Sequence, residues 1–129
     1  ALRDAGVAAA RAQVLCADIF SLLVDQGALQ DGGRWEFDAI FDCQCFHCVR
    51  LVDEAAVARI YEGLLRRGGF LLLLTGNADE PRARGPERLS REEVLGAFAG
   101  TSLVCEDLRV TRFDWTPTYR AQGLPDPPL

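Results

Sequence analysis

One segment, residues 53–75, constrains the fold more than any other part of this 129-residue chain. Apolar side chains recur every three or four positions after Asp53, which predicts a helix with Asp53 as its N-cap. The basic pair Arg66-Arg67 would lie in its last turn, and Gly68-Gly69 would end it. The apolar run from Phe70 to Thr75 follows at once and is typical of a strand covered on both faces. A helix that leads into a buried strand indicates an α/β domain with a parallel sheet.

The rest of the chain repeats this alternation of strands and helices. Further strands are predicted where short apolar runs occur, at residues 13–18, 37–42 and 102–113. Further helices are predicted at residues 1–12 and 20–29 and after Ser90. Ser90 and Glu93 have the spacing of a capping box, which marks the start of the last helix. Residues 76–88 are rich in proline, glycine and charge and are predicted to be a loop.

Composition excludes several kinds of protein. With 49% hydrophobic and 26% charged residues, the chain is predicted to form one globular domain with a packed core. A net charge of -5 argues against a nucleic-acid partner, because phosphate binding needs a basic face. The longest apolar run is far shorter than the ~20 residues that cross a bilayer, and no signal segment opens the chain. We therefore expect a soluble, cytoplasmic protein and, since the chain lacks Met, one cut from a longer chain.

In a parallel sheet, ligands bind beyond the carboxyl ends of the strands, so a site is expected there. Asp18 and Asp42 each follow a predicted buried strand. A carboxylate in such a place is costly unless it is paired, so it often faces a ligand or a helix N-terminus. A simple loop cap remains open for each acid. We predict that both carboxylates lie on the same edge of the sheet.

Three cysteines and the only histidine of the chain gather after Asp42, in the segment Cys43-Gln-Cys-Phe-His-Cys48. A zinc site is disfavoured, because all four candidate ligands lie within six residues and no second cluster exists. A cysteine nucleophile with His47 as its base is a second interpretation, although such partners usually come from distant segments. The favoured interpretation makes these cysteines small apolar fillers and His47 a satisfied, partly buried residue. Cys16 and Cys105 lie on predicted buried strands, and the scattered cysteines favour a reducing compartment.

The loop from Thr75 to Pro81 follows the clearest buried strand of the sequence. Gly76 would let its backbone approach a substrate closely, while a plain connection between elements remains open. No phosphate loop, dinucleotide fingerprint or zinc-protease helix occurs in the chain.

The order of these segments resembles that of the class I S-adenosylmethionine-dependent methyltransferases. Three runs carry the resemblance, VLCADI at residues 14–19, FDAIFDCQCFHC at 37–48 and YEGLLRRGGFLLLLTGN at 61–77. Within the family, the chain most resembles the small-molecule branch that includes thiopurine and halide or thiol methyltransferases. The resemblance implies a three-layer α/β/α domain with a Rossmann-like methyltransferase sheet. This sheet would be incomplete, with the third to sixth strands present and the first, second and seventh missing.

The resemblance also implies a cofactor, S-adenosylmethionine, and roles for residues at the strand ends. Asp18 and Ile19 correspond to the motif that meets the adenine of the cofactor. Asp42 and Cys43 correspond to the motif that closes over its methionine part and faces the transferred methyl group. The residues expected to line the acceptor are Phe46, His47, Asn77 and Glu80. No catalytic residue is assigned, because methyl transfer to a small-molecule acceptor depends mainly on holding two reactants together. No metal is assigned, because the candidate ligands lie too close together in the sequence.

The chain departs from the family at its start. The family's first motif, a glycine-rich turn that cradles the carboxypropyl end of the cofactor, is absent, as is the acid that holds the ribose hydroxyls. Residues 1–12 resemble the helix that follows the second strand. We therefore expect a C-terminal fragment that, made alone, neither binds S-adenosylmethionine tightly nor methylates an acceptor.

A non-catalytic α/β interaction domain derived from a methyltransferase is the alternative. Glycine-rich sequence directly upstream in the gene would favour the enzyme. A start codon just before Ala1 would favour the interaction domain.

Overall fold

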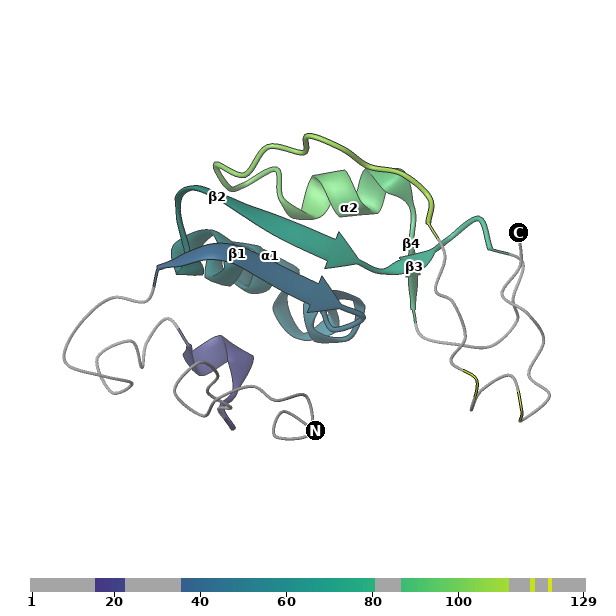
Figure 1. Ribbon diagram of the computed structural model, residues 1–129, viewed down its shortest axis with the longest axis horizontal. Helices are drawn as coiled ribbons and strands as arrows, with labels where there is room; N and C mark the ends of the chain where they lie inside the picture. Colours follow the sequence, from purple (N-terminus) through teal and green to yellow (C-terminus); the bar gives the residue numbers. More distant parts are fainter. Residues whose placement is uncertain (1–15, 23–35, 81–86, 112–116, 118–120, 122–129) are drawn as a thin grey trace. The chain divides into compact units, whose positions relative to one another are not determined.

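The computed structural model describes residues 16–22, 36–80 and 87–111, with residues 117 and 121. The chain divides into two compact units, Ala1–Arg34 and Trp35–Leu129. In chain order, the described elements are η2 (Ile19–Ser21), β1 (Phe37–Cys43), α1 (Phe46–Leu64), β2 (Leu65–Leu74), β3 (Gly76–Asn77), β4 (Arg88–Leu89) and α2 (Arg91–Ala97) (Figure 1). The helix predicted at residues 1–12 and most of the one at 20–29 lie outside the described residues.

The second unit is a mixed α/β structure with parallel strands. β1 and β2 lie side by side and parallel, and α1 connects them and packs against both (Figure 1). β3 and β4 form a second parallel pair at the two ends of the segment predicted to be a loop. The predicted strand at residues 37–42 and its parallel pairing are therefore confirmed.

α1 consists of two helical parts joined at Asp53, whose backbone is extended (φ -160°, ψ 95°). Asp53 Oδ1 accepts a hydrogen bond from the Ala56 amide N–H at 2.8 Å, so Asp53 caps the second part as predicted. The first part, residues 46–52, was not predicted from the sequence. The helix ends at Leu64, so the predicted end at Gly68-Gly69 is wrong.

The glycine pair instead forms an irregularity within β2. The pairing of β1 with β2 shifts in register between Phe37 and Ala39. Gly68 has a positive φ of 77°, a conformation that other residues rarely adopt. A Cβ on Gly69 would lie 3.0 Å from three backbone carbonyl oxygens. The Gly68-Gly69 pair is therefore needed where the two strands approach each other, and Arg66-Arg67 lies in the strand and not in a helical turn.

The core lies on the face of the β1-β2 sheet that α1 covers. The buried apolar residues that α1 contributes are Phe46, Val57, Ala58, Ile60, Tyr61 and Leu64. The opposite face is open, since Phe41 and Phe70 are each 63% exposed and Leu72 is 50% exposed. The prediction of a strand covered on both faces is therefore wrong for the described residues, because α1 covers one face only.

α2 begins as the sequence predicts. The Ser90 hydroxyl accepts a hydrogen bond from the Glu93 amide at 3.1 Å, and the Glu93 carboxylate accepts one from the Ser90 amide at 2.8 Å. Phe98, just after the helix, stacks on Phe46 with 5.5 Å between ring centroids. This ring contact ties the end of α2 to the start of α1.

The strand predicted at residues 102–113 is absent from its described part, residues 102–111. Residues 16–18, the described end of another predicted strand, are not strand either. Both segments have suitable apolar residues, but a strand requires a neighbour for its backbone hydrogen bonds. Within the described ranges, the structure also contains no helix with the length and hydropathy to span a membrane.

Candidate functional site

The candidate site lies at the carboxyl ends of β1 and β2. Cys43 pairs with Leu74, so the segments after the two strands leave the sheet at the same edge. The Gln44 amide N–H donates to the Leu74 carbonyl at 3.0 Å, which continues the pairing by one residue. Two of the three strand ends expected to form a site, residues 42–48 and the loop after Leu74, are thus brought together.

Asp42 is the buried acid of this edge, with 6% of its surface exposed. Its Oδ1 accepts hydrogen bonds from the amide N–H groups of Cys45 at 2.9 Å and Phe46 at 3.3 Å. Its Oδ2 accepts a hydrogen bond from the Tyr61 hydroxyl, on the same helix. The carboxylate therefore faces a helix N-terminus, and both of its oxygens are engaged within the chain.

The Asp42 charge acts on two neighbouring groups. Burial raises the pKa of the Tyr61 hydroxyl, and the hydrogen bond to Asp42 raises it further. Partial desolvation raises the pKa of the Cys45 thiol, with further contributions from Asp42 and Cys48. Tyr61 and Cys45 therefore keep their protons at neutral pH.

Phe46 and His47, expected to line the acceptor site, are both buried. Phe46 is 0% exposed and packs against the rings of Tyr61 and Phe98, which also contact each other, so it belongs to the hydrophobic core. His47 is 2% exposed, and its Nδ1 has no hydrogen-bond partner. The interpretation of His47 as a satisfied residue is therefore wrong, because its burial leaves one ring nitrogen unpaired.

Two other buried polar atoms near this edge lack a partner, Gln44 Oε1 and Thr75 Oγ1. Gln44 also has a left-handed backbone, with φ 66°. An unpaired buried polar atom costs about 1–3 kcal/mol, and strained backbone tends to occur at functional sites. A ligand at this edge can pair with these atoms and with His47 Nδ1 only after a local rearrangement, because all three atoms are shielded from solvent. This signal was not available from the sequence, because it depends on burial.

The cysteines are exposed, at Cys16, Cys43, Cys45, Cys48 and Cys105. The interpretation of Cys43, Cys45 and Cys48 as apolar fillers is therefore wrong, and so is the expectation that Cys16 and Cys105 are buried. Cys43 follows the alternation of β1 and lies on the same open face as Phe41. Cys45 is the N-cap residue of α1, and Cys48 lies in its first turn. Among the described residues, no thiol is hydrogen-bonded to His47, and no three His, Cys, Asp or Glu side chains form a group that could hold a metal ion.

Asp18 and Ile19 belong to the first unit. Asp18 is the N-cap of η2, and its carboxylate accepts a hydrogen bond from the Phe20 amide at 3.0 Å. Asp18 therefore acts as a local cap, which is the second of the two interpretations that its sequence position allowed. Its position relative to Asp42 stays a prediction.

Asn77 and Glu80 lie just beyond β2. Asn77 Oδ1 accepts a hydrogen bond from the Asp79 amide at 3.1 Å, which shapes the turn after β3. The Glu80 backbone carbonyl accepts a hydrogen bond from the Arg88 guanidinium. The two residues are half-buried and stabilise the β3-β4 segment beside the candidate edge.

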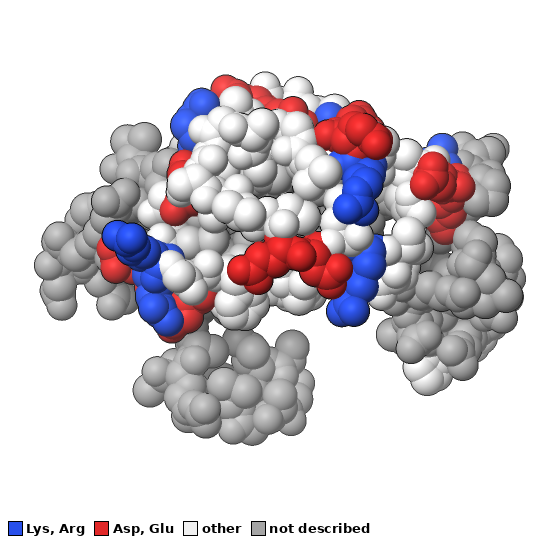
Figure 2. Space-filling view, turned by 90° about the horizontal axis from the view of Figure 1, so that it is seen from above, with Lys and Arg blue, Asp and Glu red and all other residues white. Residues whose placement is uncertain are grey.

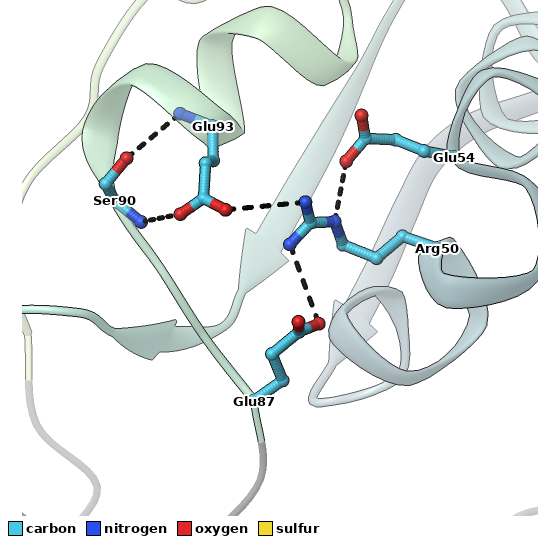
Figure 3. Close-up of polar contacts among 5 residues, drawn as sticks. All are labelled: Arg50, Glu54, Glu87, Ser90 and Glu93. Atoms are coloured by element: carbon cyan, nitrogen blue, oxygen red, sulfur yellow. Dashed lines mark hydrogen bonds and ion pairs between the residues drawn. The ribbon is translucent and has the colours of Figure 1, made fainter.

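Arg50, which no sequence pattern singled out, joins three acidic side chains (Figure 3). Its guanidinium lies 2.6 Å from Glu54 and 3.6 Å from both Glu87 and Glu93. Desolvation lowers the pKa of Arg50, but the hydrogen bond to Glu54 and the acidic charges outweigh it and raise the pKa overall. The spacing of Arg50 and Glu54 predicts their contact, whereas the contacts with Glu87 and Glu93 depend on the tertiary structure.

Arginines and acidic residues also alternate on the face seen from above, with uncharged surface between them (Figure 2).

No protein-family model, curated protein or solved structure matches the chain.

Proposed function

We propose that the chain belongs to an S-adenosylmethionine-dependent methyltransferase that acts on a small-molecule acceptor. The proposed domain is cytoplasmic, with a Rossmann-like sheet between two helix layers. The observation that carries the proposal is the parallel β1-α1-β2 unit, at whose carboxyl edge buried atoms of Gln44, His47 and Thr75 lack partners. Parallel sheets of this kind bind ligands at that edge. The order of the sequence segments supports the same family.

The residues at the edge fit this cofactor in part. Cys43 is exposed at the end of β1 and can contact a ligand directly. Asp42 has both oxygens engaged, so we assign it a positioning role: it holds the turn that follows Cys43 against α1. Asp18 and Ile19 are proposed to meet the adenine of the cofactor, as the order of the sequence segments implies.

The cofactor, when bound, supplies a methyl group on a positively charged sulfur. The protein's part is to orient the acceptor, and His47, Asn77 and Glu80 are proposed to border it. The unpaired Nδ1 of His47 can accept or donate one hydrogen bond, depending on the tautomer of the ring. Such a contact would fix the acceptor and does not require His47 to act as a base.

The test is a methyl-transfer assay on the protein encoded by the complete reading frame that contains these residues. It is incubated with S-adenosylmethionine labelled in the methyl group and with a panel of thiols, thiopurines and halide. We expect label in at least one acceptor and a loss of at least tenfold in kcat/KM for His47→Ala. The matched control is Leu51→Ala, on an exposed helix position. Absence of transfer to every acceptor, together with absence of cofactor binding, would contradict the proposal.

Protein association is the second candidate function, and the open face of the β1-β2 sheet favours it. This face exposes Phe41, Phe70 and Leu72. Contiguous apolar surface of this kind commonly marks a contact with another protein. In the methyltransferase proposal, the same face lies beneath the second helix layer. Association that is lost in Phe70→Glu, in a protein that does not bind S-adenosylmethionine, would favour the second candidate.

A further inference from the structure

Cys45 and Cys48 form a Cys-x-x-Cys pair at the junction of β1 and α1. Cys45 is the N-cap residue of α1, and Cys48 lies in its first turn. The Cys48 amide N–H donates to the Cys45 carbonyl at 2.9 Å, so the backbone between them forms a closed turn. Both residues are exposed, and an external reagent can therefore reach them.

This arrangement suits a disulfide bond. Side chains three residues apart on a helix have Cβ atoms about 5–6 Å apart, and a disulfide needs about 3.5–4.5 Å. The Cys45 side chain makes no capping hydrogen bond, so its thiol can rotate toward Cys48. A small adjustment at the end of the helix closes the remaining gap.

We propose that Cys45 and Cys48 form a dithiol site that small disulfides, such as oxidised glutathione, convert to an intrachain disulfide. One protein thiolate attacks a sulfur of the small disulfide, which forms a mixed disulfide and releases one small thiol. The second cysteine loses its proton, attacks the sulfur of the first and releases the other small thiol. The two protein thiols lose two hydrogen atoms, and the small disulfide is reduced to two thiols. This proposal does not rest on the proposed function.

The contacts of Asp42 indicate which state of the pair is favoured. In strongly oxidising Cys-x-x-Cys sites, stabilisation of the thiolate favours the reduced state. Here the Cys45 and Phe46 amides at the helix N-terminus donate to Asp42 instead. Desolvation and the Asp42 charge also raise the pKa of the Cys45 thiol. The reduced state therefore lacks this stabilisation, and the disulfide should persist once it forms.

Cys43 is the third thiol of the segment and provides the matched control. It lies at the end of β1, paired with Leu74, and is separated from Cys45 by the left-handed Gln44. It is not in the helical turn that brings Cys45 and Cys48 together. Cys43→Ser should therefore leave the pair intact.

The test treats the full chain with excess oxidised glutathione, blocks remaining thiols with N-ethylmaleimide and measures the tryptic peptide of residues 35–50 by mass spectrometry. In Cys43→Ser, we expect this peptide to lose two hydrogen atoms and to gain two fewer maleimide groups than its reduced form. In wild type, the same disulfide should form, and Cys43 should carry either a maleimide group or a glutathione. Dithiothreitol should reverse both changes. Cys45→Ser and Cys48→Ser are each combined with Cys43→Ser, which leaves one cysteine in the peptide. We expect no disulfide within the treated peptide of either double variant.

Circular dichroism of each variant checks that the fold is retained. The proposal is overturned if Cys43→Ser keeps two free thiols after treatment, or if it carries only a persistent glutathione adduct. It is also overturned if the dithiothreitol-reduced and the treated peptides of the wild type gain the same number of maleimide groups.

Discussion

The two helices of the second unit begin in different ways. The start of α1 is capped by Asp42, which comes from the preceding strand, is buried, and also accepts a hydrogen bond from Tyr61 within the helix. The start of α2 is capped by Ser90 and Glu93, within one exposed turn. The first cap fixes a strand, a turn and a helix relative to one another, whereas the second stabilises one turn. Burial and the distance between partners along the chain should therefore decide how much each cap contributes to the free energy of unfolding.

The largest effect is expected from removing the buried carboxylate. Asp42→Ala leaves the Tyr61 hydroxyl and the Cys45 and Phe46 amides without their acceptor. We expect the free energy of unfolding to fall by about 3 kcal/mol or more, since hydrogen bonds to charged groups are each worth about 1.5–3 kcal/mol. Urea unfolding followed by circular dichroism measures it. A loss similar to that of an exposed cap would remove the distinction between the two helix starts.

Tyr61→Phe sharpens the comparison, because it removes one contact of Asp42 and keeps the ring in the core. One carboxylate oxygen is left without its partner, and we expect a loss of about 1–3 kcal/mol. The same urea experiment applies, with Asp42→Asn as a companion that keeps the shape of the acid. A variant as stable as wild type would show that Oδ2 finds another partner.

Ser90→Ala removes the exposed cap of α2. The Glu93 amide loses its acceptor but is open to water, so we expect a loss of about 1 kcal/mol. Thermal unfolding against wild type measures the change. A loss equal to that of Asp42→Ala would mean that burial does not set the value of a cap here.

The smallest effect concerns acid pH. The hydrogen bond from the Ser90 amide lowers the pKa of Glu93 below its ordinary value of 4.5. A lowered pKa in the folded state gives stability that is present above the unfolded pKa and is lost as pH falls through the folded value. Glu93→Gln should therefore reduce the stability at neutral pH and flatten its decline below pH 4.5. The free energy of unfolding of wild type and of Glu93→Gln is measured against pH. An equal decline of both below pH 4.5 would contradict this role of the Glu93 charge.

The same contrast explains which features the sequence could predict. The caps at Asp53 and Ser90 use partners within three residues, so their spacing is visible in the sequence. The contact of Asp42 with Tyr61 spans nineteen residues and requires α1 to fold back onto β1. For the same reason, the sequence indicates an acid that must be paired but not the group that pairs with it.

The pattern of apolar residues is limited in a similar way as a predictor of strands. The run from Phe70 to Leu74 correctly predicts a strand, yet it cannot show that Phe70 and Leu72 are left exposed. Residues 102–111 are also apolar enough for a strand and have no strand neighbour in the described structure. In both cases, the outcome depends on which other element lies alongside.

We propose that S-adenosylmethionine binds at the carboxyl edge of β1 and β2. Calorimetric titration of the protein from the complete reading frame tests it, with Cys43→Trp to obstruct the edge and Leu51→Trp as the matched control. Both positions are exposed, and Leu51 lies on α1, outside the candidate site. We predict micromolar binding to wild type and to Leu51→Trp, weakened at least tenfold in Cys43→Trp, a change of about 1.4 kcal/mol. No binding to wild type, or equal affinity in both variants, would contradict the claim.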